Sequence, residues 1–318
     1  MRAIQLSRFG GPEVLELIET PKPVPKAGEV LIRIRAAGVN FFETLMRQDR
    51  YAVTPDLPMV FGVEVAGVVE EAGSGVEIRP GSRVASPLFA FDRPGGGYAD
   101  HIAVDARSVV PLPETLSFET AVALMVQGLT ALHAVRRSDP KDKTVLVTAA
   151  AGGVGSLLLQ LAKRSGARRA IAAAGTQEKL DLARSLGADD GTNYTHPGWV
   201  ETVHADVIYD FVGGELTETC LKALAPQGEL LFGALGRAAL GKAALEAMFA
   251  RNQALKGFAL LPLLAPETVK ADLAHLFDVA VSGGLKILPG TRFPLDQASE
   301  AHRLIDARRS TGKVVLVP

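Results

Sequence analysis

The chain has 318 residues, a length that suggests about two domains at roughly 150 residues each. Apolar residues make up 47% of it and charged residues 22%, close to the averages of globular proteins. The formal net charge is −1 and no run of Lys or Arg occurs. The electrostatic pattern of a nucleic-acid-binding protein is missing, so no nucleic-acid partner is expected.

The number of cysteines and the length of the apolar segments indicate in which cellular compartment the protein is expected. Cys220 is the only cysteine, which excludes an internal disulfide and a cysteine-rich zinc site, and we expect it to be a packed residue in a helix. The N-terminus lacks the pattern of a signal peptide, and no uninterrupted apolar run reaches about 18 residues. We therefore expect no membrane-spanning helix and a reducing, cytoplasmic location.

The first third of the chain has the pattern of short strands. Residues 30–36 alternate apolar and charged side chains, and residues 63–71 and 83–86 are further strand candidates. Clusters of Gly and Pro separate these segments. The pattern predicts a small β-rich domain, similar to a barrel or a sandwich.

From residue 118 onward, helical and strand patterns alternate. The expected helices are 118–135, 154–165, 178–186, 215–224 and 243–253, and the expected strands are 144–148, 170–174, 206–211 and 229–233. This alternation predicts an α/β fold with a parallel sheet covered by helices on both faces. The remaining tail, with helices at 267–282 and 297–308 and a strand at 313–317, is too short for a domain and is expected to pack on the first third.

The strongest local signal is a glycine-rich loop that follows a buried strand and opens a helix. Gly152 lets the backbone approach a pyrophosphate, and Gly155 lets the helix pack closely on the strand. The helix N-terminus supplies N–H groups and the positive end of the helix dipole. The loop predicts a dinucleotide-binding site made by Ala150, Gly152, Gly153, Val154 and Gly155.

The end of the second strand indicates which dinucleotide is bound. An NAD site normally has Asp or Glu there, about 20 residues after the loop, to bind the ribose hydroxyls. Residues 172–176 read Ala-Ala-Ala-Gly-Thr, and Lys179 follows one helical turn later. A cation without a carboxylate favours a 2′-phosphate, and hence NADPH. A solvated helix face is the other interpretation of Lys179.

The wider pattern resembles a known family. The signature of the quinone oxidoreductase (zeta-crystallin-like) family is matched at every spacing by Asp142-Lys143, Leu146, Ala150-Ala151-Gly152-Gly153, Gly155, Gln160 and Lys163. This family belongs to the medium-chain dehydrogenase/reductase superfamily. The resemblance implies a GroES-like β-rich catalytic domain at residues 1–122, completed by 263–318, and a Rossmann-type doubly wound NADPH-binding domain at 123–262.

The resemblance also implies cofactor contacts. In family members the 2′-phosphate of NADPH is held by a Gly-Thr-x-x-Lys segment, a downstream Tyr and an Arg near the C-terminus. These positions correspond here to Gly175, Thr176, Lys179, Tyr194 and Arg308, with Arg309 as the alternative to Arg308. Thr130, at the end of a stretch that lies against the nicotinamide in relatives, and Phe232 and Gly233, which border its other side, are further expected cofactor contacts.

Three residues are the expected catalytic groups. The resemblance places Asn40, Tyr51 and Gln127 at the substrate cleft, where a hydroxyl or an amide can stabilise negative charge on a substrate oxygen. From their chemistry alone, Asn40 is equally a turn residue and Tyr51 equally a packed aromatic residue.

A metal site is not expected. Zinc alcohol dehydrogenases of the same superfamily bind the catalytic zinc with a Cys/His/Cys set. The position of the first of these cysteines falls near Asn40 in this sequence, where no cysteine occurs. The Gly-His-Glu element reads Gly62-Val63-Glu64, and valine cannot ligate a metal. For Glu64, without a metal, we expect a structural role at the base of the cleft.

The resemblance implies a zinc-independent, NADPH-dependent reductase that transfers a hydride to a quinone or a related conjugated carbonyl. Two alternatives stay open: an enal, enone or enoyl-thioester reductase of the same superfamily, and a non-catalytic NADPH-binding sensor or structural protein. Relatives are commonly dimers, so a homodimer is expected, with the apolar segment 256–261 as the edge strand that joins two sheets.

Overall fold

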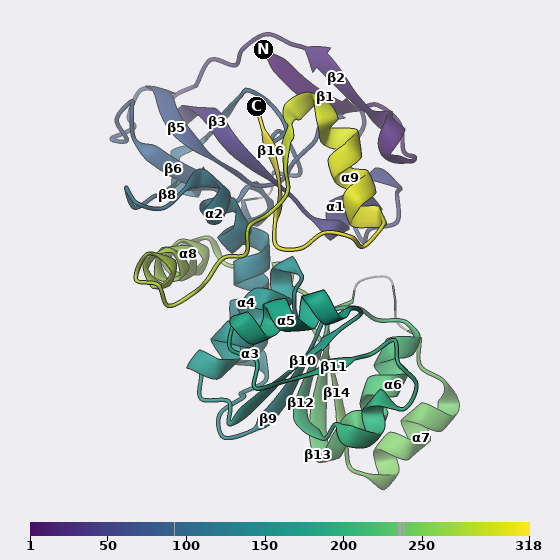
Figure 1. Ribbon diagram of the computed structural model, residues 1–318. Coiled ribbons are helices and arrows are strands. Elements are labelled where there is room, and N and C mark those ends of the chain that lie inside the picture. The colour runs from purple at the N-terminus through teal and green to yellow at the C-terminus, as the bar shows by residue number, and fades with distance from the viewer. Residues whose placement is uncertain (92, 235–236, 238) are drawn as a thin grey trace. The chain divides into compact units, whose positions relative to one another are not determined.

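Two structural units divide the chain. The computed structural model describes residues 1–318 except 92, 235–236 and 238. Unit 1 comprises Met1–Leu129 and Leu264–Pro318, and unit 2 comprises Thr130–Leu263 (Figure 1). A continuous helical run leads from unit 1 into unit 2, because α2 (Phe118–Ala123), a π-helical turn (Leu124–Gly128) and α3 (Leu129–Arg137) follow one another directly. The domain bounds expected from the sequence, 1–122 and 123–262, stay a prediction.

Unit 1 is built around the long strand β3 (Glu29–Val39). One edge of β3 pairs with β5 (Val65–Ala72), and the other edge pairs with β7 (His101–Asp105) and β16 (Val314–Val317). This sheet also contains β6 (Arg83–Ser86), β8 (Val110–Pro111) and β15 (Arg292–Pro294), and a smaller sheet contains β1 (Arg2–Leu6), β2 (Leu15–Glu19) and β4 (Met59–Val60). Ile32 and Ile34 of β3 are buried while Arg33 is exposed, as the alternation predicts.

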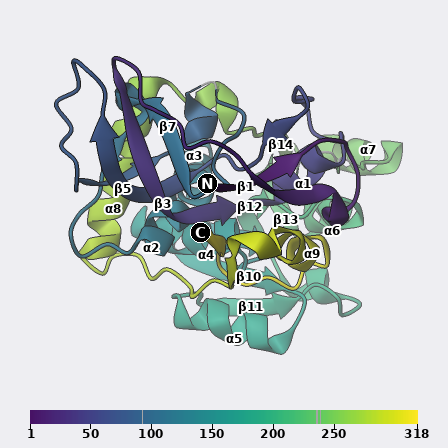
Figure 2. The same ribbon diagram turned by 90° about the horizontal axis from the view of Figure 1, so that it is seen from above.

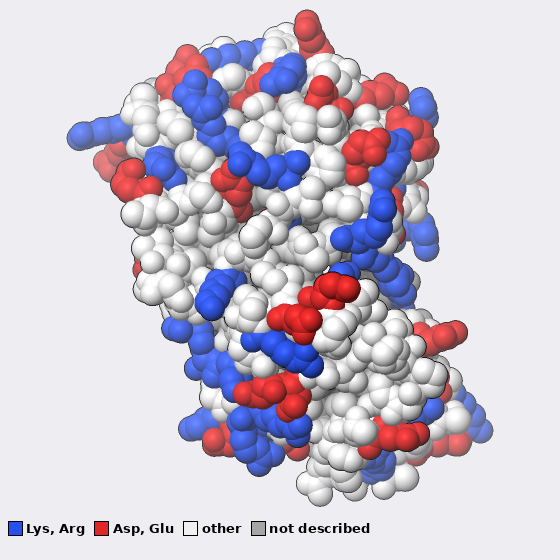
Figure 3. Space-filling model, viewed as in Figure 1, with Lys and Arg blue, Asp and Glu red and all other residues white. Residues whose placement is uncertain are grey.

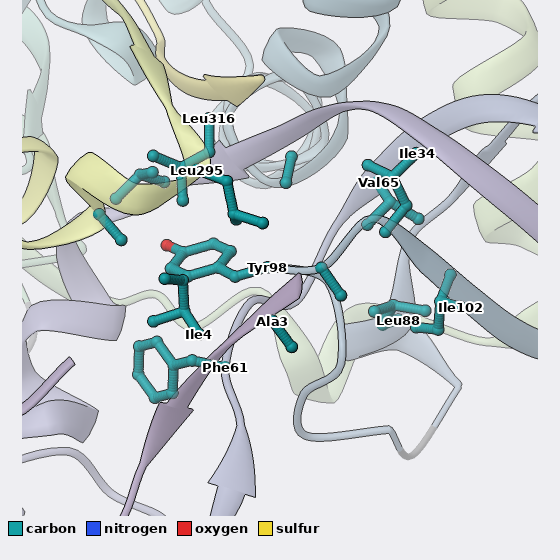
Figure 4. Close-up of a cluster of buried hydrophobic side chains, with 14 of the residues drawn as sticks. Ala3, Ile4, Ile34, Phe61, Val65, Leu88, Tyr98, Ile102, Leu295 and Leu316 are labelled. Carbon is teal, nitrogen blue, oxygen red and sulfur yellow. The ribbon is translucent and has the colours of Figure 1, made fainter. Parts of the chain in front are cut away.

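The C-terminal tail packs on the first third of the chain, which confirms the expectation. Strand β16 completes the sheet beside β3, and α9 (Ala298–Asp306) packs against α1 (Phe41–Arg47). Helix α8 (Pro266–Val281) packs beside the π-helical turn. The core of unit 1 therefore combines residues from both ends of the chain, such as Ile4 and Leu316 (Figure 4).

Tyr98 lies at the centre of this core. Its ring packs edge-on against Phe61 (Figure 4). Its hydroxyl lies 3.3 Å from Nε2 of His302 on α9. Burial, together with the positive charge of Arg47, lowers the pKa of His302 to about 3, so this histidine is neutral. A neutral imidazole can pair with the phenol without placing a further charge in the core.

Unit 2 is a parallel α/β sheet, as predicted. Its six strands have the spatial order β11-β10-β9-β12-β13-β14, which is 3-2-1-4-5-6 in chain order. They are β9 (Thr144–Thr148), β10 (Arg169–Ala174), β11 (Asp190–Asn193), β12 (Ala205–Asp210), β13 (Leu224–Phe232) and β14 (Ala254–Gly257). Helices α4 (Gly153–Arg164), α5 (Gln177–Ser185) and α6 (Glu215–Ala223) pack against it, with α5 alongside β11 in Figure 2, and α7 (Lys242–Ala250) contacts α6.

The edge strand of this sheet ends earlier than expected. Segment 256–261 was the predicted edge strand, whereas β14 covers only Ala254–Gly257. Phe258 donates one more backbone hydrogen bond to Phe232 and then buries its ring edge-on against Phe211, at a centroid distance of 5.8 Å. This anchoring of Phe258 in the core, followed by a 3-10 turn at Leu261–Leu263, explains why the strand does not continue.

The helical run from Phe118 to Arg137 bears on the expectation that no helix spans a membrane. Phe118–Arg137 is long and apolar enough to cross a bilayer by length and composition, although no uninterrupted apolar run of that length occurs. In the structure 72% of its most apolar window is buried inside the protein. Burial of this extent is typical of a core helix, whose apolar side chains are covered by protein.

Candidate active site

The glycine-rich loop leads from the carboxyl end of β9 into α4. Gly152 is the N-cap residue, with extended backbone (φ −79°, ψ 175°), and no side chain caps the helix. A Cβ atom on Gly155 would overlap the carbonyl oxygen of Ala149, so only glycine allows this close approach. The first N–H groups of α4 have no intrahelical partner, and the loop therefore fits the pyrophosphate of a dinucleotide.

The residues of unit 2 that are expected at the 2′-phosphate follow the ends of β10 and β11. Thr176 caps α5 by accepting a hydrogen bond from the backbone N–H of Lys179 at 3.3 Å. The hydroxyl of Tyr194, which follows β11, lies 3.5 Å from the point that a Cβ of Gly175 would occupy. Arg308 belongs to unit 1, where it follows α9 in a left-handed conformation (φ 55°).

The other expected cofactor contacts of unit 2 also have defined places. Phe232 ends β13, and Gly233 follows it, where a Cβ would overlap the ring of Phe211. Thr130 is buried in the first turn of α3. The loop, Gly175, Tyr194 and Gly233 thus all follow carboxyl ends of parallel strands, the edge at which ligands bind in open α/β sheets.

Asp210 is a buried residue at this edge that the sequence analysis did not identify. Its Oδ1 accepts hydrogen bonds from the N–H groups of Val212 (2.9 Å) and Gly213 (3.1 Å) and from the hydroxyl of Thr148 (3.2 Å). Its Oδ2 accepts one from the Thr217 hydroxyl at 2.6 Å. Asp210 thereby joins the ends of β9 and β12 to the start of α6.

A buried polar cluster lies where β3 ends in unit 1. Asn40 donates its side-chain N–H groups to Glu43 Oε2 (3.1 Å) and Glu64 Oε1 (2.9 Å), and its Oδ1 accepts from Lys313 Nζ at 2.6 Å. Lys313 also forms an ion pair with Glu64 Oε1. Both amide hydrogens of Asn40 are therefore bound by carboxyl groups of the protein. The structural role expected for Glu64 takes the form of this ion pair.

Glu43, at the third position of α1, is held in its acid form within this cluster. Burial raises its pKa from 4.5 to about 8, and the negative charge of Glu64 acts in the same direction, while Lys313 opposes both. At neutral pH most molecules therefore carry a protonated Glu43, which leaves Glu64 as the anion that balances Lys313.

This protonation predicts a pH dependence of stability. Because the folded state keeps a proton that the unfolded state loses above pH 4.5, the contribution of Glu43 to stability falls as the pH rises from about 4.5 to about 8, by roughly 1.4 kcal/mol per pH unit at most. The Glu43→Gln variant, which is neutral at every pH, is expected to show a flatter dependence in this window. Urea unfolding at several pH values measures it, and equal slopes in the two proteins would contradict the prediction.

The two remaining expected catalytic residues lie elsewhere in unit 1. Gln127 is part of the π-helical turn and is partly exposed. Tyr51 follows α1 and packs against the ring of Phe42 at a centroid distance of 5.2 Å. Burial raises the pKa of the Tyr51 phenol, so it keeps its proton and can act as a hydrogen-bond donor.

Metal-ligating side chains do not gather at this site. Among residues 1–318 other than 92, 235–236 and 238, no group of three or more His, Cys, Asp or Glu side chains has the geometry to hold a metal ion. The position next to Glu64 is Val63, whose side chain has no donor atom.

Comparison with known proteins agrees with the geometry of both units. The alcohol dehydrogenase GroES-like domain family matches residues 26–114, and the family described as zinc-binding dehydrogenase matches residues 186–316. The quinone oxidoreductase of Pseudomonas aeruginosa is 35% identical, with 100% of this chain and 99% of that protein covered.

Two solved structures cover the whole chain. The quinone oxidoreductase of Thermus thermophilus, solved alone and with NADPH, is 35% identical with a TM-score of 0.85, and 100% of both chains is covered. A structure described as an NAD-dependent alcohol dehydrogenase is 32% identical with a TM-score of 0.89, again with 100% of both chains covered.

A GroES-like unit combined with a Rossmann-type unit defines an oxidoreductase of the medium-chain dehydrogenase/reductase superfamily. Within this superfamily, the similarity to a quinone oxidoreductase extends over the full length of both chains. The chain belongs to the zinc-independent quinone oxidoreductase family, which confirms the resemblance seen in its sequence.

Proposed function

We propose that this protein is an NADPH-dependent quinone reductase that transfers a hydride to a quinone or a similar conjugated carbonyl without zinc. The observation that carries the proposal is the arrangement at the end of β10. Residues 172–176 contain no carboxylate to bind a ribose hydroxyl. Thr176 caps α5, whose first turn contains Lys179, and the Tyr194 hydroxyl lies 3.5 Å from the point that a Cβ of Gly175 would occupy. A cation and hydroxyl donors suit a 2′-phosphate, which distinguishes NADPH from NADH.

The residues of unit 2 would hold the cofactor in three places. The loop at 150–155 receives the pyrophosphate at the N-terminus of α4. The 2′-phosphate is bound by Gly175, Thr176, Lys179 and Tyr194. A contact of Arg308 or Arg309 with this phosphate stays a prediction from the resemblance. Thr130, Phe232 and Gly233 bind at the nicotinamide end. When bound, NADPH supplies the hydride from its C4 atom.

The residues of unit 1 would act on the substrate oxygen. A quinone that accepts a hydride becomes an anion, and one proton then completes the hydroquinone. The Tyr51 hydroxyl and the Gln127 side-chain amide are donors that can stabilise this anion, and Tyr51 or water supplies the proton. Asn40 contributes by organising the buried cluster, because its own amide hydrogens already bind Glu43 and Glu64.

Steady-state kinetics with simple quinones tests the proposed function. The purified protein is expected to oxidise NADPH in the presence of a quinone, and to do so with a much higher kcat/KM than with NADH. An enal, an enone and an enoyl thioester are assayed alongside. Turnover of these alone would favour the reductase alternative, and NADPH binding without turnover of any carbonyl would favour a sensor.

Replacement of Tyr51 tests its role in the chemical step. Tyr51→Phe removes one hydroxyl donor and is expected to lower kcat roughly 10- to 100-fold. The dissociation constant for NADPH is expected to stay unchanged, because the cofactor contacts lie on other residues. Phe42→Leu, which alters the packing beside Tyr51 but removes no hydroxyl, is the matched control. Equal kcat values for wild type and Tyr51→Phe would exclude the role.

The exposed edge of the unit 2 sheet supports a proposed homodimer. Strand β14 pairs only with β13 among the described residues, and Leu255 on it is 39% exposed. An unpaired strand edge with an apolar side chain favours pairing with a second copy of the chain. We infer a cytoplasmic location for this dimer. Light scattering at micromolar concentration measures the mass, and a single-chain mass would contradict the dimer.

A further inference from the structure

Three side chains far apart in the sequence meet because of the sheet register in unit 1. Ala37 pairs with Val65 across β3 and β5, and Val39 pairs with Val314 across β3 and β16. Asn40 follows β3, whereas Glu64 and Lys313 each directly precede a flanking strand. The antiparallel pairing on both edges of β3 therefore brings these three residues to the same end of the sheet.

The charges of this cluster are removed from water. Lys313 and Glu64 have side chains that are 2% and 0% exposed. Gly38 lies against both, because a Cβ atom there would overlap Glu64 Oε1 and approach Lys313 Cε within 2.6 Å. A buried ion pair of this kind contributes little net stability compared with apolar residues of the same size, so stability alone does not account for it.

One carboxylate oxygen of Glu64 reaches outside the cluster. Its Oε1 binds Lys313 and Asn40, while its Oε2 accepts the backbone N–H of Val126 at 2.9 Å. Val126 lies in the π-helical turn Leu124–Gly128, and the next residue is Gln127. On the same turn, Gly128 lies against Leu276 of α8, where a Cβ would come within 3.2 Å.

We propose that Glu64 and Lys313 form a positioning pair that fixes the Val126–Gln127 segment of the π-helical turn and so aims the Gln127 amide at the substrate oxygen. A π-helical turn has wider hydrogen-bond spacing than an α-helix, and such turns frequently occur at functional sites. The bond from Val126 to the buried carboxylate of Glu64, which Lys313 and Asn40 also bind, holds this turn at one point. The role assigned to Gln127 rests on the proposed reductase function.

Lys313 is required because Glu64 has to remain an anion. Glu43, the other carboxyl group in the cluster, is mostly protonated at neutral pH, so Lys313 balances Glu64 alone. Without the ammonium group, the buried Glu64 carboxyl group would lose its ion pair, and its hydrogen bond from Val126 would be held less firmly. Replacing either Glu64 or Lys313 should therefore displace Gln127 in the same way.

The test uses Glu64→Gln and Lys313→Met, both similar in size to the native side chains, in the full-length protein. We expect each variant to lower kcat about 10- to 100-fold, as displaced supporting residues typically do, while the dissociation constant for NADPH stays unchanged. Each change is then combined with Gln127→Ala. If the pair acts through Gln127, the double variants lose little more activity than Gln127→Ala alone. Losses that multiply independently would overturn the proposal.

Amide hydrogen exchange provides a readout that does not depend on activity. Exchange in residues 124–128 is expected to be faster in Glu64→Gln and Lys313→Met than in wild type. Val69→Ala, which truncates a buried side chain of β5 at the position paired with Ile32, controls for general loss of stability. Unchanged exchange, or acceleration equal to that in Val69→Ala, would overturn the positioning role. A wild-type protein without reductase activity would refute the proposed function instead, while the exchange result would still decide whether the pair holds the turn.

Discussion

Replacing Lys179 with alanine is expected to weaken NADPH binding roughly 10- to 150-fold, because a hydrogen bond to a charged group contributes about 1.5–3 kcal/mol. Lys179 lies in the first turn of α5, where Thr176 caps the helix and Tyr194 approaches Gly175. NADH has no 2′-phosphate, so its affinity should remain unchanged. Calorimetric titration of both proteins with both cofactors measures the difference.

Arg184→Ala is the matched control for Lys179→Ala. It removes one positive charge from the same helix, and its native partner is the exposed Asp181 at 2.7 Å. Loss of such a surface ion pair is expected to change cofactor affinity little. If NADPH affinity fell equally in both variants, a general charge effect would explain it. If Lys179→Ala bound NADPH as well as wild type, the 2′-phosphate site would be assigned wrongly.

Replacing Asp210 with alanine is expected to cost about 3 to 5 kcal/mol of unfolding free energy, the largest loss of stability that we predict. Four donors would lose their acceptor at once in a site without access to water, since Asp210 is fully buried. The only tryptophan, Trp199, lies in unit 2 and is largely buried. Its fluorescence during urea unfolding therefore reports the stability of this unit.

Asp206→Ala is the matched control for Asp210→Ala, because it also removes a carboxylate from β12 but leaves the buried hydrogen-bond network intact. Asp206 accepts a hydrogen bond from the Thr144 N–H at 2.8 Å, but its side chain is 40% exposed, so water can replace it. The expected loss is within about 1 kcal/mol. Similar midpoints for the two variants would show that the buried network does not stabilise the strand ends as inferred.

Local patterns predicted much of unit 2, although β11 was missed and the edge strand β14 was expected at 256–261. The continuous apolar run of β9 and the glycine-rich loop after it each carry a signal within a few residues, and both are found as expected. Cys220 is buried in α6, also as expected. Elements with weak periodicity were missed. The strands β1, β2 and β7 are short and lack a clear alternation, and the helix α1 has only 7 residues, about two turns.

The buried cluster of unit 1 could not be derived in the same way. Lys313 and Glu64 are 249 residues apart, and only the pairing of β3 with β5 and β16 brings them together. The π-helical turn could not be predicted either, because its residues continue the apolar pattern of an ordinary α-helix. On the face shown in Figure 3, positive and negative side chains are interspersed.

The burial of the single cysteine has a consequence for the chemistry of the substrates. Quinones and enones are electrophiles that alkylate thiolates by conjugate addition, and the thiolate is the reactive form of cysteine. Cys220 is 0% exposed, and burial, with the negative charge of Asp210, raises the pKa of its thiol. Because the chain has no other cysteine, it presents no accessible thiol to these electrophiles. Its substrates can therefore reach the protein surface without arylating a cysteine there.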